Sequence, residues 1–133
     1  MQNGKIIFEQ YTKAESLSKA FSLASGTKSF SGVLALAAQE DGLLNLDERV
    51  SLTLPEWSRK RYAKDVTIRQ LLHLESGIRT KVRRGRPPSY SQAIKIAFDN
   101  APGERFQYGG EPFQIFGEIL QRKLQAKGKS VAQ

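Results

Sequence analysis

The sequence predicts a mostly helical domain of the α+β class. Several segments place apolar residues at helical spacing, and one segment near the N-terminus has the composition of a strand. The chain has 133 residues, of which 39% are hydrophobic and 26% charged. These values are typical of a globular protein that buries a core. We therefore expect residues 1–133 to form a single domain.

The predicted strand covers residues 4–12, "GKIIFEQYT". Its β-branched and aromatic residues alternate in part with polar ones, as in a half-buried strand. A lone strand cannot satisfy its own backbone hydrogen bonds. Because no second strand pattern is evident, we expect this chain to be an incomplete part of a larger domain.

The first helix is predicted from Ser25 to about Asp41 and ends at Gly42. Its apolar residues cover most of the helix circumference, which is typical of a buried helix. They are Phe30, Val33, Leu34, Leu36, Ala37 and Ala38. We expect the following segment, 43–57, to be irregular or to contain short 3₁₀ turns, because it includes Pro55.

Three further helices are predicted. Residues 67–78 begin with the capping-box pair Thr67 and Gln70 and end at Gly77, and residues 93–101 follow a second capping box at Ser89 and Gln92. The last helix begins near Pro112 and carries an apolar stripe on one side. We expect residues 126–133 to form a frayed tail.

The charge is unevenly distributed. The net charge is +8; residues 1–60 contain seven Lys/Arg and seven Asp/Glu, and residues 61–133 contain fourteen and six. The densest basic stretch is "RTKVRRGR", residues 79–86. Nucleic-acid binding is one interpretation. A solvated loop is the favoured one, because no aromatic residue that could stack on a base lies among the arginines.

Several functional classes find no support in the sequence. There is no cysteine, so disulfides, thiolate metal sites and cysteine nucleophiles are excluded. The single histidine, His73, lies between two leucines and is interpreted as a helix residue rather than a proton shuttle. We expect no metal and no organic cofactor. No apolar segment has the length of a membrane span, and "MQNGKIIFEQ" lacks a signal-peptide pattern. The compartment and the oligomeric state remain open.

The stretch "LASGTKSFSG", residues 23–32, places Ser25 three residues before Lys28. In a helix these side chains share a face, one turn apart. An apolar setting would favour a neutral lysine, which can activate a serine, and the helix N-terminus would stabilise an oxyanion. Read alone, this spacing equally fits a serine helix cap and a solvated lysine.

Three longer blocks make the stretch recognisable: "FSLASGTKSFSGVLALAAQEDGLLNLDERVSLTLPEW", "VTIRQLLHLESGI" and "APGERFQYGGEPFQIFGEILQRKL". On these blocks the chain resembles the serine β-lactamase and penicillin-binding-protein superfamily, in particular its branch of class C-like β-lactamases, D-alanyl-D-alanine peptidases and esterases. The resemblance covers residues 4–125. It implies the mostly helical portion of the β-lactamase/transpeptidase-like fold, with the C-terminal sheet strands missing.

The resemblance also assigns roles to single residues. It implies that Ser25 is the acylated nucleophile, that Lys28 is the lysine of the first motif, and that Tyr108 is the second-motif tyrosine acting as general base and acid. The family's Tyr-x-Asn motif reads Tyr108-Gly109-Gly110 here, so a glycine occupies the position of the substrate-binding asparagine. The third motif, Lys-Thr-Gly or His-x-Gly, does not occur in the sequence.

The resulting hypothesis is a serine hydrolase that forms an acyl-enzyme on Ser25, as part of a longer enzyme. Its substrate is a β-lactam, a D-Ala-D-Ala peptide or an ester, and Gly110 shifts the balance toward esters or peptides. The alternative is a truncated fragment or pseudoenzyme that retains the packing of the family without its chemistry.

Overall fold

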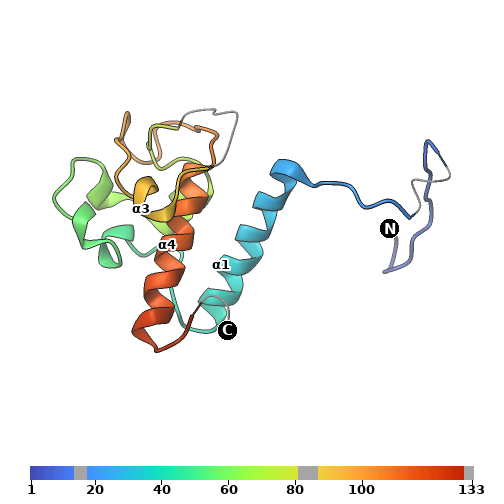
Figure 1. Cartoon of the computed structure of the whole chain (residues 1–133), viewed down its shortest axis with the longest axis horizontal. Coiled ribbons are helices and arrows are strands. Elements are labelled where there is room, and N and C mark those ends of the chain that lie inside the picture. The colour runs from blue at the N-terminus through green and yellow to red at the C-terminus, as the bar shows by residue number, and fades with distance from the viewer. Residues whose placement is uncertain (14–17, 81–86, 131–133) are drawn as a thin grey trace.

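The computed structural model describes residues 1–13, 18–80 and 87–130. Most regular structure in these ranges is helical (Figure 1). In chain order the elements are η2 (Ala24–Ser29), α1 (Phe30–Glu40), η3 (Val50–Leu52), η4 (Pro55–Trp57), η5 (Ala63–Asp65), α2 (Ile68–Leu72), α3 (Tyr90–Ala93) and α4 (Glu111–Ala126). The predicted 3₁₀ turns within residues 43–57 are confirmed as η3 and η4.

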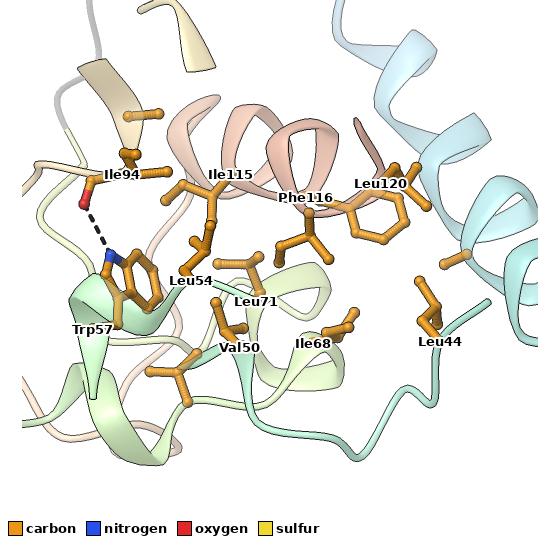
Figure 2. Packing of buried hydrophobic residues seen from close by; sticks show 14 of the residues in the cluster. Leu44, Val50, Leu54, Trp57, Ile68, Leu71, Ile94, Ile115, Phe116 and Leu120 are labelled. Atoms are coloured by element: carbon orange, nitrogen blue, oxygen red, sulfur yellow. Dashed lines mark hydrogen bonds between the residues drawn. The ribbon is translucent and has the colours of Figure 1, made fainter. Parts of the chain in front are cut away.

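The hydrophobic core lies between α4 and the segments η3 to α3 (Figure 2). Ile115 of α4 points toward Leu54, and the Phe116 ring lies beside Leu120; all four side chains are buried. At one end of the core, the indole Nε1 of Trp57 donates a hydrogen bond of 2.8 Å to the Ile94 carbonyl. The last predicted helix is thus confirmed, with its apolar stripe turned inward.

A partly buried arginine joins α4 to the 3₁₀ segments. Arg122 Nη2 and Nη1 donate to the two carboxylate oxygens of Glu56 at 2.8 and 3.0 Å, and Arg122 Nε donates to Glu118 at 2.7 Å. This forked geometry matches the planar guanidinium to a carboxylate. The hydrogen bond to Arg122 is the main reason why the pKa of Glu56 lies below its ordinary value.

Helix α1 departs from the sequence prediction. Only Ala35 and Ala38 are buried on it, whereas Phe30 is 61%, Val33 66% and Leu34 51% exposed. The helix runs diagonally beside α4, with its outer face uncovered (Figure 1). The predicted all-round burial is wrong for the described residues, because none of their elements packs on that face.

The predicted strand at 4–12 is also wrong. Within residues 1–13 the backbone makes one isolated bridge, between Gln2 and Lys5, around a tight turn. Ile6, Ile7 and Phe8 are between 65% and 75% exposed, and the segment extends away from the helices (Figure 1). A strand requires a neighbour that completes its hydrogen bonds, and no described segment provides one.

Two helices are shorter than predicted. The Thr67–Gln70 capping box is present, but α2 ends at Leu72, and Leu74 then adopts a left-handed conformation with φ 63°. The predicted helix 93–101 is replaced by α3, which ends at Ala93. Further on, Phe98 pairs with Ile78 in an isolated antiparallel bridge. In this segment a long-range backbone bridge forms in place of the predicted helix, so tertiary pairing overrides the local helix propensity.

The basic stretch lies mostly outside the described residues, which resume at Pro87. Of its described members, Arg79 pairs with Asp99 through Nη2 at 2.7 Å. Among the described helices, none combines the length and apolar character that crossing a membrane requires.

Candidate functional site

The pair Ser25 and Lys28 lies in η2, before the α-helix begins. A 3₁₀ helix has about 3 residues per turn, so side chains three positions apart are eclipsed rather than offset. Lys28 Nζ lies 3.0 Å from Ser25 Oγ and donates a hydrogen bond to it. The predicted contact is thus present, although Ser25 is exposed and Lys28 only partly buried.

The backbone immediately before this pair is strained. Ala24 has φ 45°, in the left-handed region, where a residue with a Cβ pays roughly 1–2 kcal/mol. The Ser22 hydroxyl oxygen accepts a hydrogen bond of 3.2 Å from the Ala24 amide. Such strain is common at functional sites, where it directs a side chain. Here it begins the turn that carries Ser25.

Tyr108 approaches the pair from a different part of the chain. It lies in the connection before α4, 83 positions after Ser25, and its side chain is 47% exposed. The Lys28 Nζ lies 5.5 Å from the centroid of the Tyr108 ring. This distance is within the range of a cation–π contact. The fold therefore brings together the three residues to which the resemblance assigns catalytic roles.

The electrostatic surroundings favour the phenolate form of Tyr108. Its pKa lies below the ordinary tyrosine value, chiefly because of a hydrogen bond with the Ser25 side chain. A hydrogen bond and the positive charge of Lys28 lower the pKa further, against the opposing effect of desolvation. The Ser25 hydroxyl thus accepts a hydrogen bond from Lys28 and also contacts Tyr108, whose phenol is more acidic than usual.

A cavity of about 510 Å³ opens next to these side chains. Its polar end contains Ser25, Lys28 and Tyr108, and much of the remaining wall is apolar. The other lining residues are Ser29, Gly32, Ala35, Leu36, Leu46, Arg69, Leu72, His73, Leu74 and Phe113. A largely apolar cleft with a few convergent polar groups is the usual form of a small-molecule site.

Sequence reasoning missed part of this lining. His73 is exposed at the end of α2 and lines the cavity. Arg69 also lines it, and its guanidinium donates to both carboxylate oxygens of Asp47 at 2.7 and 2.9 Å. Phe113 contributes from the first turn of α4. No local sequence signal distinguishes these residues, because only tertiary packing directs them to one place.

The two glycines after Tyr108 have different surroundings. Gly110 precedes α4 and is not among the residues that line the cavity. A Cβ on Gly110 would meet only Pro87 Cβ, at 4.0 Å. A Cβ on Gly109 would come within 2.5 Å of Thr80. The position of the family's asparagine therefore has room for a side chain, whereas the position before it has none.

The described ranges contain no group of three or more His, Asp and Glu side chains that could hold a metal ion. The side chains that line the cavity include the Ser25 hydroxyl, the Lys28 amine, the Tyr108 phenol and the His73 imidazole. These groups can transfer protons and form a covalent bond to an electrophilic carbon.

Comparison with known proteins gives a consistent result. A family model described as "Beta-lactamase" matches residues 1–133. The chain is 28% identical over 140 aligned positions to "Protein flp" of Staphylococcus aureus strains COL and MW2. The alignment covers 91% of this chain and 28% of those proteins. The chain thus spans little more than a quarter of the length of these curated relatives.

A solved structure is similar as well. The crystal structure of a protein from Bacteroides dorei DSM 17855, assigned to the beta-lactamases, superimposes with a TM-score of 0.51 at 30% sequence identity. The superposition covers 65% of this chain and 27% of that protein. The helical arrangement described above is thus similar to part of a β-lactamase-like fold.

Proposed function

This chain belongs to the beta-lactamase family, and from that premise we propose that it carries the nucleophile of a serine hydrolase that forms an acyl-enzyme on Ser25. One observation supports the proposal most strongly. Lys28 Nζ donates to Ser25 Oγ at 3.0 Å and lies 5.5 Å from the centroid of the Tyr108 ring, and all three side chains line one cavity.

The proposed reaction begins with proton transfer to Tyr108. As a phenolate it takes the proton of Ser25, while the Lys28 ammonium stabilises the negative charge. Ser25 Oγ then forms a bond to the substrate carbonyl carbon. Tyr108 returns the proton to the leaving group as the bond between that group and the carbonyl carbon breaks. Water hydrolyses the resulting ester by the same steps and restores the serine hydroxyl.

The residue at position 110 favours an ester or peptide over a β-lactam as the substrate. The family's asparagine at this position binds the substrate amide and orients the lysine, and Gly110 has no side chain for either role. An ester acyl group depends less on such an amide contact. The apolar cavity wall is suited to the hydrocarbon part of such a substrate.

We expect this chain alone to react slowly. In the family, the strand with the third motif supplies one oxyanion-hole N–H, and that motif does not occur in this sequence. Loss of one such donor typically costs about 2.7–4 kcal/mol in the transition state, or 10²–10³ in rate. A reagent that traps the serine is therefore a better probe than a turnover assay.

The test is covalent labelling of the 133-residue chain with a fluorophosphonate or a labelled penicillin. Mass spectrometry should locate the adduct on Ser25, and Ser25→Ala should abolish it. Ser29→Ala is the matched control, because Ser29 lines the same cavity one turn away and should leave labelling intact. An adduct spread over several serines, or one unchanged in Ser25→Ala, would contradict the proposal.

The second candidate is a family member without catalysis. Gly110 favours it, because an essential part of the second motif is missing. The same labelling experiment distinguishes the two candidates. A folded chain in which fluorophosphonate never reaches Ser25 would support the pseudoenzyme.

A further inference from the structure

The main chain at Tyr108 is held by a side chain from a distant segment. Thr80 Oγ1 donates a hydrogen bond of 2.9 Å to the Tyr108 carbonyl oxygen. The residues lie 28 positions apart, and Thr80 is the second residue of the basic stretch 79–86. Neither the resemblance nor the reaction above assigns Thr80 a role.

The same side chain also contacts the next residue. A Cβ on Gly109 would lie 2.5 Å from both Thr80 Cβ and Thr80 Cγ2. Real Cβ atoms essentially never approach another heavy atom closer than 3.0 Å. Gly109 therefore lets the Thr80 methyl group pack directly against the backbone, while the Thr80 hydroxyl reaches the Tyr108 carbonyl. The hydroxyl and the methyl group of Thr80 thus both contact the backbone of residues 108–109.

A second hydrogen bond holds the chain on the other side of Tyr108. The Gln107 amide donates to the Leu74 carbonyl at 2.7 Å. Leu74 and Thr80 belong to the same segment, so this segment fixes the backbone both before and after Tyr108. Tyr108 is 47% exposed, so burial alone does not fix its ring. The position of the ring beside Lys28 depends in part on these backbone contacts.

We propose that Thr80 is a positioning residue for Tyr108: its hydroxyl and methyl groups hold the backbone at Tyr108 so that the ring lies near Lys28. The inference rests on the proposed function for its catalytic meaning. Thr80 itself touches none of the reacting atoms. It acts through the backbone of the tyrosine that exchanges the proton.

The test uses the pKa of Tyr108 as a measure of its position, because Ser25 and Lys28 lower that pKa only when the ring lies beside them. The 133-residue chain is labelled with ¹³C at the tyrosine Cζ and titrated by NMR. Tyr108→Phe assigns the resonance among the four tyrosines. Two matched pairs isolate the hydroxyl: wild type against Thr80→Val, and Thr80→Ser against Thr80→Ala.

The proposal expects Thr80→Val and Thr80→Ala to titrate closer to an ordinary tyrosine, near pH 10. Thr80→Ser should remain closer to wild type. Thr53→Val, a distant change of the same kind, should have no effect. The fluorescence of the single tryptophan, Trp57, reports whether each variant is folded. If Thr80→Val does not fold, the serine–alanine pair decides.

Unchanged Tyr108 titration in folded variants that lack the Thr80 hydroxyl would overturn the proposal. This outcome is distinct from failure of the proposed function, because the titration requires no reaction at Ser25. If Ser25 is labelled and the Tyr108 pKa is unchanged in the Thr80 variants, the proposed hydrolase function is supported and the positioning role of Thr80 is rejected. If Ser25 is not labelled but the Tyr108 pKa is shifted in those variants, the positioning role is supported and the hydrolase function is rejected.

Discussion

At the scale of single residues, the doublet Gly109-Gly110 combines two different requirements. A Cβ on Gly109 would lie 2.5 Å from Thr80 and 2.6 Å from Glu111 Oε2, whereas a Cβ on Gly110 would make only an ordinary contact with Pro87 at 4.0 Å. The sequence alone cannot distinguish these two roles, because both residues are glycine. They are distinguished by a tertiary contact with Thr80, which lies 29 positions before Gly109 in the chain.

This difference gives a stability prediction with a built-in control. Gly109→Ala should lower the free energy of unfolding by about 1–3 kcal/mol, the usual cost of overpacking. Gly110→Ala should change it by less than about 1 kcal/mol, because its φ of −92° suits alanine and its Cβ meets only Pro87 at 4.0 Å. Denaturant unfolding of the two variants, followed by Trp57 fluorescence, measures both values. Equal destabilisation would contradict the contact.

The acidity of Tyr108 leads to a second prediction at this scale. Because the folded-state pKa is lowered, the phenolate should form below pH 10, the ordinary midpoint of tyrosine. Ser25→Ala should raise the pKa of Tyr108, since the Ser25 hydrogen bond is the largest single cause of the lowered value. Lys28→Met should also raise it, because Lys28 lowers this pKa through a hydrogen bond and through its charge. The labelled-tyrosine titration measures both shifts, and an unchanged pKa in Ser25→Ala would contradict the Ser25 contact.

At the scale of elements, the most informative feature is the link between α4 and η4. Arg122 binds Glu56 with two hydrogen bonds and Glu118 with a third. About a third of each side chain in the Arg122–Glu56 pair is exposed, so solvent screens the pair only in part. One guanidinium thus links two sections of the chain that lie 66 positions apart.

Loss of this link should appear in the acid limb of the stability curve. The pKa of Glu56 is lower in the folded chain than its ordinary value of about 4.3. The ionised Glu56 therefore stabilises the fold above about pH 4.3, and this stabilisation is lost as the pH falls through the lowered folded-state pKa. Arg122→Met should reduce stability at neutral pH by about 1–2 kcal/mol and flatten the pH dependence below 4.3. Arg59→Met, at an exposed arginine, should leave both unchanged. The measurement is urea unfolding between pH 3 and 7.

The element scale also shows which sequence predictions hold and why others fail. The capping box placed the start of α2 correctly, although not its end, and the apolar stripe placed α4, because both signals act within one helix. The strand at 4–12 and the buried first helix were wrong, because both depend on neighbouring elements that the described residues do not supply. The Ser25–Lys28 contact followed from local spacing. Tyr108 followed only from the family resemblance, because no local pattern connects residues 83 positions apart.

At the scale of the whole molecule, the candidate site is divided between two parts of unequal burial. Ser25 and Lys28 precede α1, on which only Ala35 and Ala38 are buried. Tyr108 belongs to the part that contains the core, where Ile115 and Ile119 are fully buried. The three side chains can meet only while α1 remains packed against that part.

This division predicts an order of hydrogen exchange. Local opening is cheapest where few apolar side chains are buried, so the amides of residues 34–37 in α1 should exchange at least about tenfold faster than those of residues 115–119 in α4. Two-dimensional NMR of the chain in D₂O measures both sets. Equal protection would mean that α1 opens only with the core. Faster exchange in α1 would mean that the alignment of Ser25 and Lys28 with Tyr108 is lost before the core unfolds. Reactivity of Ser25 would then depend on the packing of α1 against the core.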